Sequence, residues 1–113
     1  MTLALQRLDA DISVAPQLGP VAMAEAKAAG FRSVINNRPD FEAGPTQPTN
    51  ASVEAAARTA GLEYAYLPVA PNFQSPEEIA RFRALIDSMP KPILAFCRSG
   101  TRSGKLWRAA TGG

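Results

Sequence analysis

Residues 93–107 read Ile93-Leu94-Ala95-Phe96-Cys97-Arg98-Ser99-Gly100-Thr101-Arg102-Ser103-Gly104-Lys105-Leu106-Trp107. The four apolar residues after Pro92 predict a short buried strand, and the segment from Lys105 onward predicts the start of a helix. The turn between them carries the only cysteine of the protein. This stretch is therefore predicted to be a strand–turn–helix unit with a thiol at the end of its strand.

The position of Cys97 indicates its chemistry. A strand-to-helix turn directs backbone N–H groups and the positive end of the helix dipole toward one point, and Arg98 and Arg102 are close in sequence. These influences favour the thiolate, so Cys97 is predicted to act as a nucleophile with Arg102 as its catalytic partner. The other turn residues predicted to bind an anionic substrate are Arg98, Ser99, Gly100, Thr101 and Ser103. The alternative is an ordinary buried cysteine beside a flexible turn. A nucleotide-binding loop is excluded because the two glycines lie one residue too close together.

The composition narrows the classes of function. With 113 residues, the chain is predicted to form a single domain over residues 1–113. One cysteine cannot form an internal disulfide, which favours a reducing, cytoplasmic location. The absence of histidine removes the commonest metal ligand, so no metal is expected, and the chemistry predicted for Cys97 needs no cofactor. A net charge of +2 and the lack of a long apolar run argue against nucleic-acid binding and membrane insertion.

The order of patterns predicts an α/β domain. Strands are expected over residues 5–8, 12–14, 31–36, 62–69 and 93–96. Helices are expected over residues 21–29, over residues 52–60 with Ser52 as the N-cap, after the capping box at Ser75, and from Lys105. Alternating strands and helices favour three layers with a mostly parallel central sheet and flanking helices. In such sheets ligands bind beyond the carboxyl ends of the strands, where Cys97 is predicted to lie.

The segment from Cys97 to Ser103, preceded by an apolar strand, resembles the active loop of rhodanese-type sulfurtransferases. Together with residues 27–40 and 60–64, it resembles the bacterial beta-lactamase hydrolase-like family, phosphatase-like domain. The resemblance implies a fold like that of dual-specificity protein tyrosine phosphatases, with sulfur transfer in some members. It also implies a metallo-beta-lactamase-fold partner or fused domain, because related domains are joined to such proteins.

The length of the loop separates two chemistries that this resemblance leaves open. Tyrosine phosphatase loops place their arginine six positions after the cysteine, whereas Arg102 stands five positions after Cys97, as in rhodanese-type loops. The segment that supplies the general acid in dual-specificity phosphatases corresponds to residues 68–76, which contain neither Asp nor Glu. The first prediction is therefore a sulfurtransferase that forms a persulfide on Cys97 and passes the sulfur to a thiol or cyanide.

Two alternatives stay open. The first is a cysteine-dependent phosphatase in which Asp40, from the proline-rich loop over residues 37–50, serves as the general acid. The second is a carrier module that holds sulfane sulfur or an anion for a partner. Asp40 and Glu42 are otherwise expected to be solvated loop charges, and Arg38 could face either the anion site or the solvent.

Overall fold

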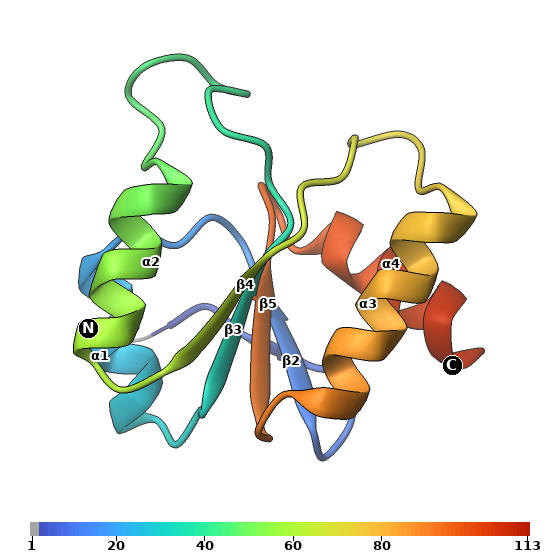
Figure 1. Ribbon diagram of the computed structural model, residues 1–113, viewed down its shortest axis with the longest axis horizontal. Helices are drawn as coiled ribbons and strands as arrows, with labels where there is room; N and C mark the ends of the chain where they lie inside the picture. Colours follow the sequence, from blue (N-terminus) through green and yellow to red (C-terminus); the bar gives the residue numbers. More distant parts are fainter. Residues whose placement is uncertain (1–2) are drawn as a thin grey trace.

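The computed structural model describes residues 3–113, in which a five-stranded sheet lies between two pairs of helices (Figure 1). The strands are β1 (Gln6–Arg7), β2 (Ile12–Ala15), β3 (Ser33–Asn36), β4 (Glu63–Tyr66) and β5 (Ile93–Phe96). The helices are α1 (Val21–Ala28), α2 (Asn50–Thr59), α3 (Pro76–Ser88) and α4 (Thr101–Thr111). The predicted three-layer α/β fold is confirmed.

The sheet has the order β1-β2-β5-β3-β4, and all its pairs are parallel except the short edge pair of β1 with β2. Strand β5 lies between β2 and β3, so that Phe96 is opposite Ala15 on one side and Asn36 on the other. The carboxyl ends of three parallel strands therefore meet next to Cys97, the residue that follows β5.

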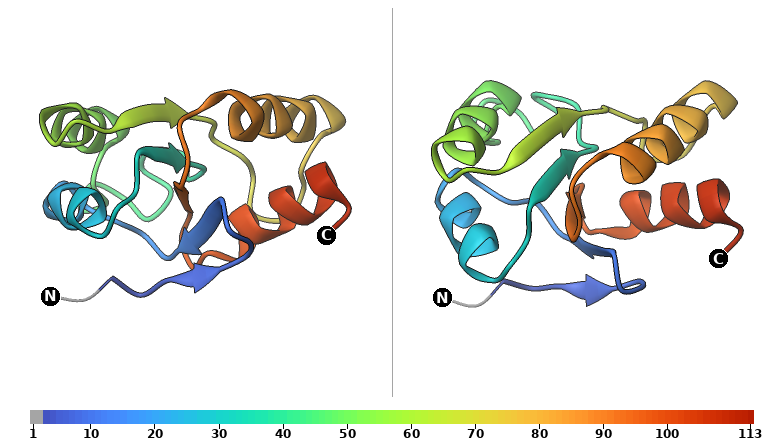
Figure 2. Two further views of the ribbon diagram at one scale, coloured as in Figure 1. Left: turned by 90° about the horizontal axis from the view of Figure 1, so that it is seen from below. Right: turned by 60° about the horizontal axis from the view of Figure 1, so that its bottom comes forward.

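The sheet is covered on both faces, as Figure 2 shows in views from below. Helices α1 and α2 pack on one face together with Leu94 and Phe96 of β5, and helices α3 and α4 pack on the other with Ile93 and Ala95. A parallel strand buried on both faces needs apolar residues at every position, which explains the unbroken apolar run of β5. Across residues 3–113, no helix is both long and apolar enough to cross a bilayer.

Several predicted element ends differ from the structure by a few residues, and three of these differences have a clear physical reason. Thr49, and not Ser52, is the N-cap of α2, because its hydroxyl accepts the N–H of Ser52 at 3.2 Å. Strand β4 ends at Tyr66, although the N–H of Leu67 still donates to the carbonyl of Asn36 at 2.9 Å. The predicted capping box at Ser75 is confirmed.

The third difference concerns α4, which begins at Thr101 rather than at Lys105. The turn after Cys97 is thus only three residues long, and Arg102 and Ser103 lie in the first turn of the helix. Gly100 makes this early start favourable, since it is the N-cap and has a φ of 90° that residues with a side chain rarely adopt. A Cβ atom at Gly100 would also lie 3.4 Å from the carbonyl carbon of Ala15.

Candidate active site

Cys97 lies at the base of a pocket formed where β5 meets α4. Its side chain is buried, and its Sγ accepts a hydrogen bond from the N–H of Gly100 at 3.1 Å. Backbone N–H groups at the start of a helix stabilise negative charge, so the turn is suited to hold an anion beside this sulfur. The sulfur thus occupies the position expected of a nucleophile.

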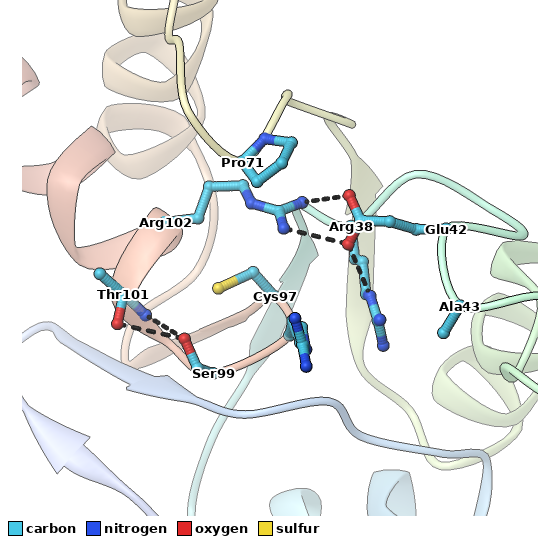
Figure 3. Close-up of a pocket in the computed structure, with 9 residues that line it drawn as sticks. Arg38, Glu42, Ala43, Pro71, Cys97, Ser99, Thr101 and Arg102 are labelled. Carbon is cyan, nitrogen blue, oxygen red and sulfur yellow. Dashed lines mark hydrogen bonds and ion pairs between the residues drawn. The ribbon is translucent and has the colours of Figure 1, made fainter.

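The pocket has a volume of about 590 Å³ and opens between three loops (Figure 3). One wall comes from the start of α4 and another from the loop between β3 and α2, and Pro71 contributes from the loop between β4 and α3. The lining residues are Arg38, Glu42, Ala43, Pro71, Cys97, Arg98, Ser99, Thr101 and Arg102. Three arginines and one carboxylate therefore surround the thiol.

Arg102 is held in place by two acceptors from distant parts of the chain. Its Nη1 donates to Glu42 Oε2 at 3.1 Å and to the carbonyl of Val69 at 3.0 Å, and its Nη2 donates to Glu42 Oε1 at 3.0 Å. The guanidinium is a rigid fork, so these bonds fix its plane. The two bonds to Glu42 use the edge of the guanidinium formed by Nη1 and Nη2. The edge formed by Nε and the second hydrogen of Nη2 stays available to an anion.

The Nε atom of Arg102 is buried and has no hydrogen-bond partner within residues 3–113. A buried donor without a partner is unfavourable by about 1–3 kcal/mol. Such a donor next to a nucleophilic sulfur favours a site that an oxyanion completes. It is the second indication, besides the N–H groups of the turn, that the pocket binds a negatively charged group.

Glu42 connects Arg102 with a second arginine. Its Oε1 also accepts Nε–H of Arg38 at 2.9 Å, and Nη1 of Arg38 donates to Gln17 Oε1 at 3.1 Å. Burial alone would raise the pKa of the Glu42 carboxyl, but hydrogen bonds from Arg102 and Arg38 and their positive charges bring this pKa below its usual value. Glu42 is therefore ionised at neutral pH and cannot donate a proton there.

A buried hydrogen bond joins the start of α4 to the end of β3. The hydroxyl of Ser103 donates to Asn37 Oδ1 at 2.8 Å, and both side chains are buried. Asn37 Nδ2 donates to the carbonyl of Leu67 at 3.0 Å, so the bond extends to the loop after β4. Ser103 was predicted to bind the substrate. It does not line the pocket and instead fixes the helix that carries Arg102.

The other predicted site residues divide into two groups. Arg98, Ser99 and Thr101, which were predicted to bind the substrate, line the pocket, and Gly100 contributes its N–H to the sulfur rather than a pocket wall. Asp40, the predicted acid of the phosphatase alternative, lies outside the pocket lining: its Oδ1 accepts the N–H of Asn50 at the start of α2, at 2.7 Å. Asp40 thus stabilises a helix start, and Glu42 is the carboxylate beside Cys97.

Sequence reasoning did not identify Glu42 or assign Arg38 to the site. Their spacing of four residues brings an arginine and a glutamate together on a helix, but this segment was predicted to be a loop, so the spacing was no usable signal. The long proline-rich loop gave no reason to place this pair beside a cysteine 55 positions away. No group of three or more cysteine, histidine or acidic side chains within residues 3–113 is arranged to hold a metal ion.

The fold and this geometry define a class, which is the cysteine-based, phosphatase-like α/β proteins. The family model for the beta-lactamase hydrolase-like protein, phosphatase-like domain, matches residues 4–113, and the chain belongs to that family. The expected resemblance is thereby confirmed.

Relatives and solved structures agree with this assignment. A "Beta-lactamase hydrolase-like protein" of Xylella fastidiosa (strain Temecula1) is 42% identical over 78 residues, which are 69% of this chain and 18% of that protein. The chain thus spans about a fifth of this curated relative. The crystal structure of a candidate phosphatase from Neisseria meningitidis Z2491 has a TM-score of 0.85 and 32% identity, covering 94% of this chain and 75% of that one. A structure of Tk-PTP has a TM-score of 0.72 at 17% identity, covering 96% and 73% of the two chains, which supports the tyrosine phosphatase-like fold alone.

These comparisons favour the phosphatase alternative over the first prediction. The family description names a phosphatase-like domain, the Neisseria structure at 32% identity is described as a candidate phosphatase, and neither of them supports sulfur transfer. A cysteine-based site on a phosphatase-like fold is therefore the part of the functional prediction that holds.

Proposed function

We propose that this chain is a cysteine-dependent phosphatase that acts on small phosphate monoesters. The observation that carries the proposal is the buried Cys97 sulfur, which accepts the Gly100 N–H and lines the same pocket as Arg102, whose Nε has no partner within residues 3–113. This arrangement suits a phosphoryl group, because a nucleophile and donors for the nonbridging oxygens face the same space.

The reaction would proceed in two steps. The Cys97 thiolate attacks phosphorus, and an S–P bond forms as the bond to the leaving oxygen breaks. The leaving group departs as an oxyanion and takes a proton from solvent. A water molecule then attacks phosphorus, the S–P bond breaks, the thiolate is regenerated, and the proton lost by the water passes to solvent. Arg102 and the N–H groups of the turn stabilise the charge on the phosphoryl oxygens in both steps.

The pocket constrains the leaving group. Glu42 is its only carboxylate, and this group is ionised and engaged with two arginines. Without a proton donor in the pocket, departure of a strongly basic alkoxide is unfavourable. The proposed substrates are therefore phosphate esters with weakly basic leaving groups, such as aryl phosphates.

The direct test is the hydrolysis of 4-nitrophenyl phosphate by the wild-type protein and by the Cys97→Ser variant. Turnover by the wild type, its loss in Cys97→Ser and an unchanged circular dichroism spectrum would support the proposal. Equal rates for the two proteins would show that the hydrolysis does not use Cys97 and would refute it.

A second candidate function is sulfur transfer, and a specific observation favours it. The loop places Arg102 five positions after Cys97, and α4 already begins at Thr101, so the ring of N–H groups is small. A sulfane sulfur is smaller than a phosphoryl group, and its transfer from thiosulfate expels sulfite, which needs no acid. The thiolate would attack the outer sulfur, the new S–S bond would form as sulfite leaves with the electron pair, and an acceptor thiolate would then remove the outer sulfur.

Intact mass spectrometry after exposure to thiosulfate separates the two functions. A gain of one sulfur atom by the wild type but not by Cys97→Ser, with release to a thiol, would support sulfur transfer. An adduct that no small thiol removes would favour the carrier alternative, in which a partner takes the sulfur. The matched segment is only 18% of the Xylella relative, so that protein has room for further domains. A fused or separate metallo-beta-lactamase-fold partner that takes up the sulfur is therefore part of this second proposal.

A further inference from the structure

A second arginine is held at a fixed position in the pocket beside the reacting centre. The side chain of Arg38 is only 8% exposed, and it lines the same pocket as Cys97. Glu42 and Gln17 hold its Nε and Nη1 atoms, so its position is set by the protein before any ligand arrives. No group within residues 3–113 accepts a hydrogen bond from its Nη2 nitrogen, which leaves that donor to a ligand.

The charges of these groups do not cancel. Glu42 carries one negative charge and pairs with two guanidinium groups, so one positive charge remains on Arg38 and Arg102 together. Arg98, which is exposed and lines the pocket, adds another. The phosphoryl group at Cys97 would use the open edge of Arg102 and the N–H groups of the turn. Arg38 and Arg98 are not needed for that contact.

The pocket is also larger than one phosphoryl group requires. Its volume is about 590 Å³. A single water molecule needs only about 10–15 Å³ of such space. A phosphoryl group of four heavy atoms therefore fills only a small part of it. In Figure 3, the Arg38 guanidinium lies on the side of the Glu42 carboxylate that faces away from Arg102.

We infer that the pocket has a second anion subsite at Arg38, supported by Arg98, and that the substrate carries a second phosphate or carboxylate group beside the group that reacts at Cys97. This inference rests on the proposed phosphatase function and specifies its substrate class. A guanidinium with a free donor binds an oxyanion through charge-assisted hydrogen bonds, each of which contributes about 1.5–3 kcal/mol. One such bond corresponds to at least about a tenfold gain in affinity.

The test compares inorganic phosphate with inorganic diphosphate as probes, in buffer free of divalent metals. Their dissociation constants are measured by calorimetry, and their inhibition constants are measured against 4-nitrophenyl phosphate. We expect wild-type protein to bind diphosphate about tenfold more tightly than phosphate. In Arg38→Met the ratio of the two constants should fall toward one, and in Arg98→Gln it should fall by a smaller factor.

Diphosphate carries more charge than phosphate and gains affinity for any cationic protein. Arg81→Met is therefore the matched control, because Arg81 is exposed on α3, outside the pocket lining, and the change in net charge is the same. This variant should keep the wild-type ratio. An equal fall in Arg81→Met and Arg38→Met would show that only net charge matters and would overturn the inference.

The outcomes separate this inference from the proposed function. If 4-nitrophenyl phosphate is hydrolysed through Cys97 but phosphate and diphosphate bind equally, the second subsite is refuted and the phosphatase stands. If neither anion binds and no ester is hydrolysed, the proposed function itself fails. If Arg38→Met does not unfold cooperatively, the inference is tested by the ratio of the phosphate and diphosphate dissociation constants in the wild type and in Arg98→Gln. Arg98 is exposed, so its replacement leaves the buried contacts intact.

Discussion

Replacing Glu42 with glutamine tests whether this residue positions Arg102 or competes with the substrate for it. The carboxylate accepts three hydrogen bonds, from Arg102 Nη1 at 3.1 Å, Arg102 Nη2 at 3.0 Å and Arg38 Nε at 2.9 Å. Glutamine keeps one oxygen acceptor and turns the other position into a donor that faces a guanidinium donor. At least one charge-assisted hydrogen bond is thus lost, and both arginines lose their counter-charge.

The size of the effect follows from the burial of the pair. Breaking a fully buried ion pair costs about 3–5 kcal/mol. The Glu42 side chain is 21% exposed, and partial solvation reduces this cost, so we expect a loss of about 2 kcal/mol in the free energy of unfolding. Such a loss lowers the melting temperature by roughly 10 °C in a domain of this size. If Arg102 loses its orientation, kcat/KM for 4-nitrophenyl phosphate should fall by about thirtyfold, the equivalent of the same 2 kcal/mol.

The assay combines thermal unfolding with steady-state kinetics, and the control is Glu54→Gln. Glu54 also pairs with an arginine four residues away, but its side chain is 40% exposed on α2, so the control should change neither quantity appreciably. A Glu42→Gln protein that binds inorganic phosphate more tightly, or shows a higher kcat/KM, would refute the argument. That result would mean that Glu42 occupies the anion site instead of shaping it.

Three further outcomes follow from other features of the structure. Ser103→Ala removes the donor to Asn37 Oδ1 and leaves this buried acceptor unpaired, so the free energy of unfolding measured with urea should fall by about 1–3 kcal/mol. Ser99→Ala, at the exposed turn, is the control and should change this free energy little. Burial raises the pKa of Tyr64, so the folded protein keeps the phenol proton above about pH 10, where the unfolded chain loses it. The free energy of unfolding should therefore fall as the pH rises above about 10, and it should fall less in Tyr64→Phe. Across a series of aryl phosphates, the rate of the Cys97 reaction should fall steeply as the pKa of the leaving phenol rises, and a flat dependence would indicate a proton donor in the site.

Local patterns were sufficient to predict the elements and their order. The apolar run of β5 and the capping box at Ser75 are signals contained within a few residues, and both elements lie where they were predicted. The start of α4 was misplaced because its first turn has no apolar periodicity. Its beginning is set instead by the left-handed conformation of Gly100 and by the close approach of that residue to Ala15.

The missing parts of the site depend on contacts between distant residues. Glu42 and Arg102 are 60 positions apart, and Asn37 and Ser103 are 66 positions apart. A proline-rich loop carries no period from which the direction of a side chain can be inferred, so Glu42 had the features of any solvated loop charge. The sequence did predict a proline-rich loop over residues 37–50, but not that Glu42, rather than Asp40, lines the pocket.

That choice between the two acids decides the chemistry of the pocket. Had Asp40 faced Cys97 with a raised pKa, a proton donor would stand beside the leaving group, and a broad range of phosphate esters would be accessible. Asp40 instead accepts the N–H of Asn50, and the carboxylate that faces the thiol is kept ionised by two arginines. The site thus combines a buried cysteine sulfur with an anion cradle, and the described lining residues include no proton-donating acid. A leaving group that departs without a proton meets this requirement, and both an aryl oxide and sulfite do so. Both candidate activities use the Cys97 sulfur as the nucleophile. They are therefore distinguished by the leaving group, which is an aryl oxide in phosphate ester hydrolysis and sulfite in sulfur transfer.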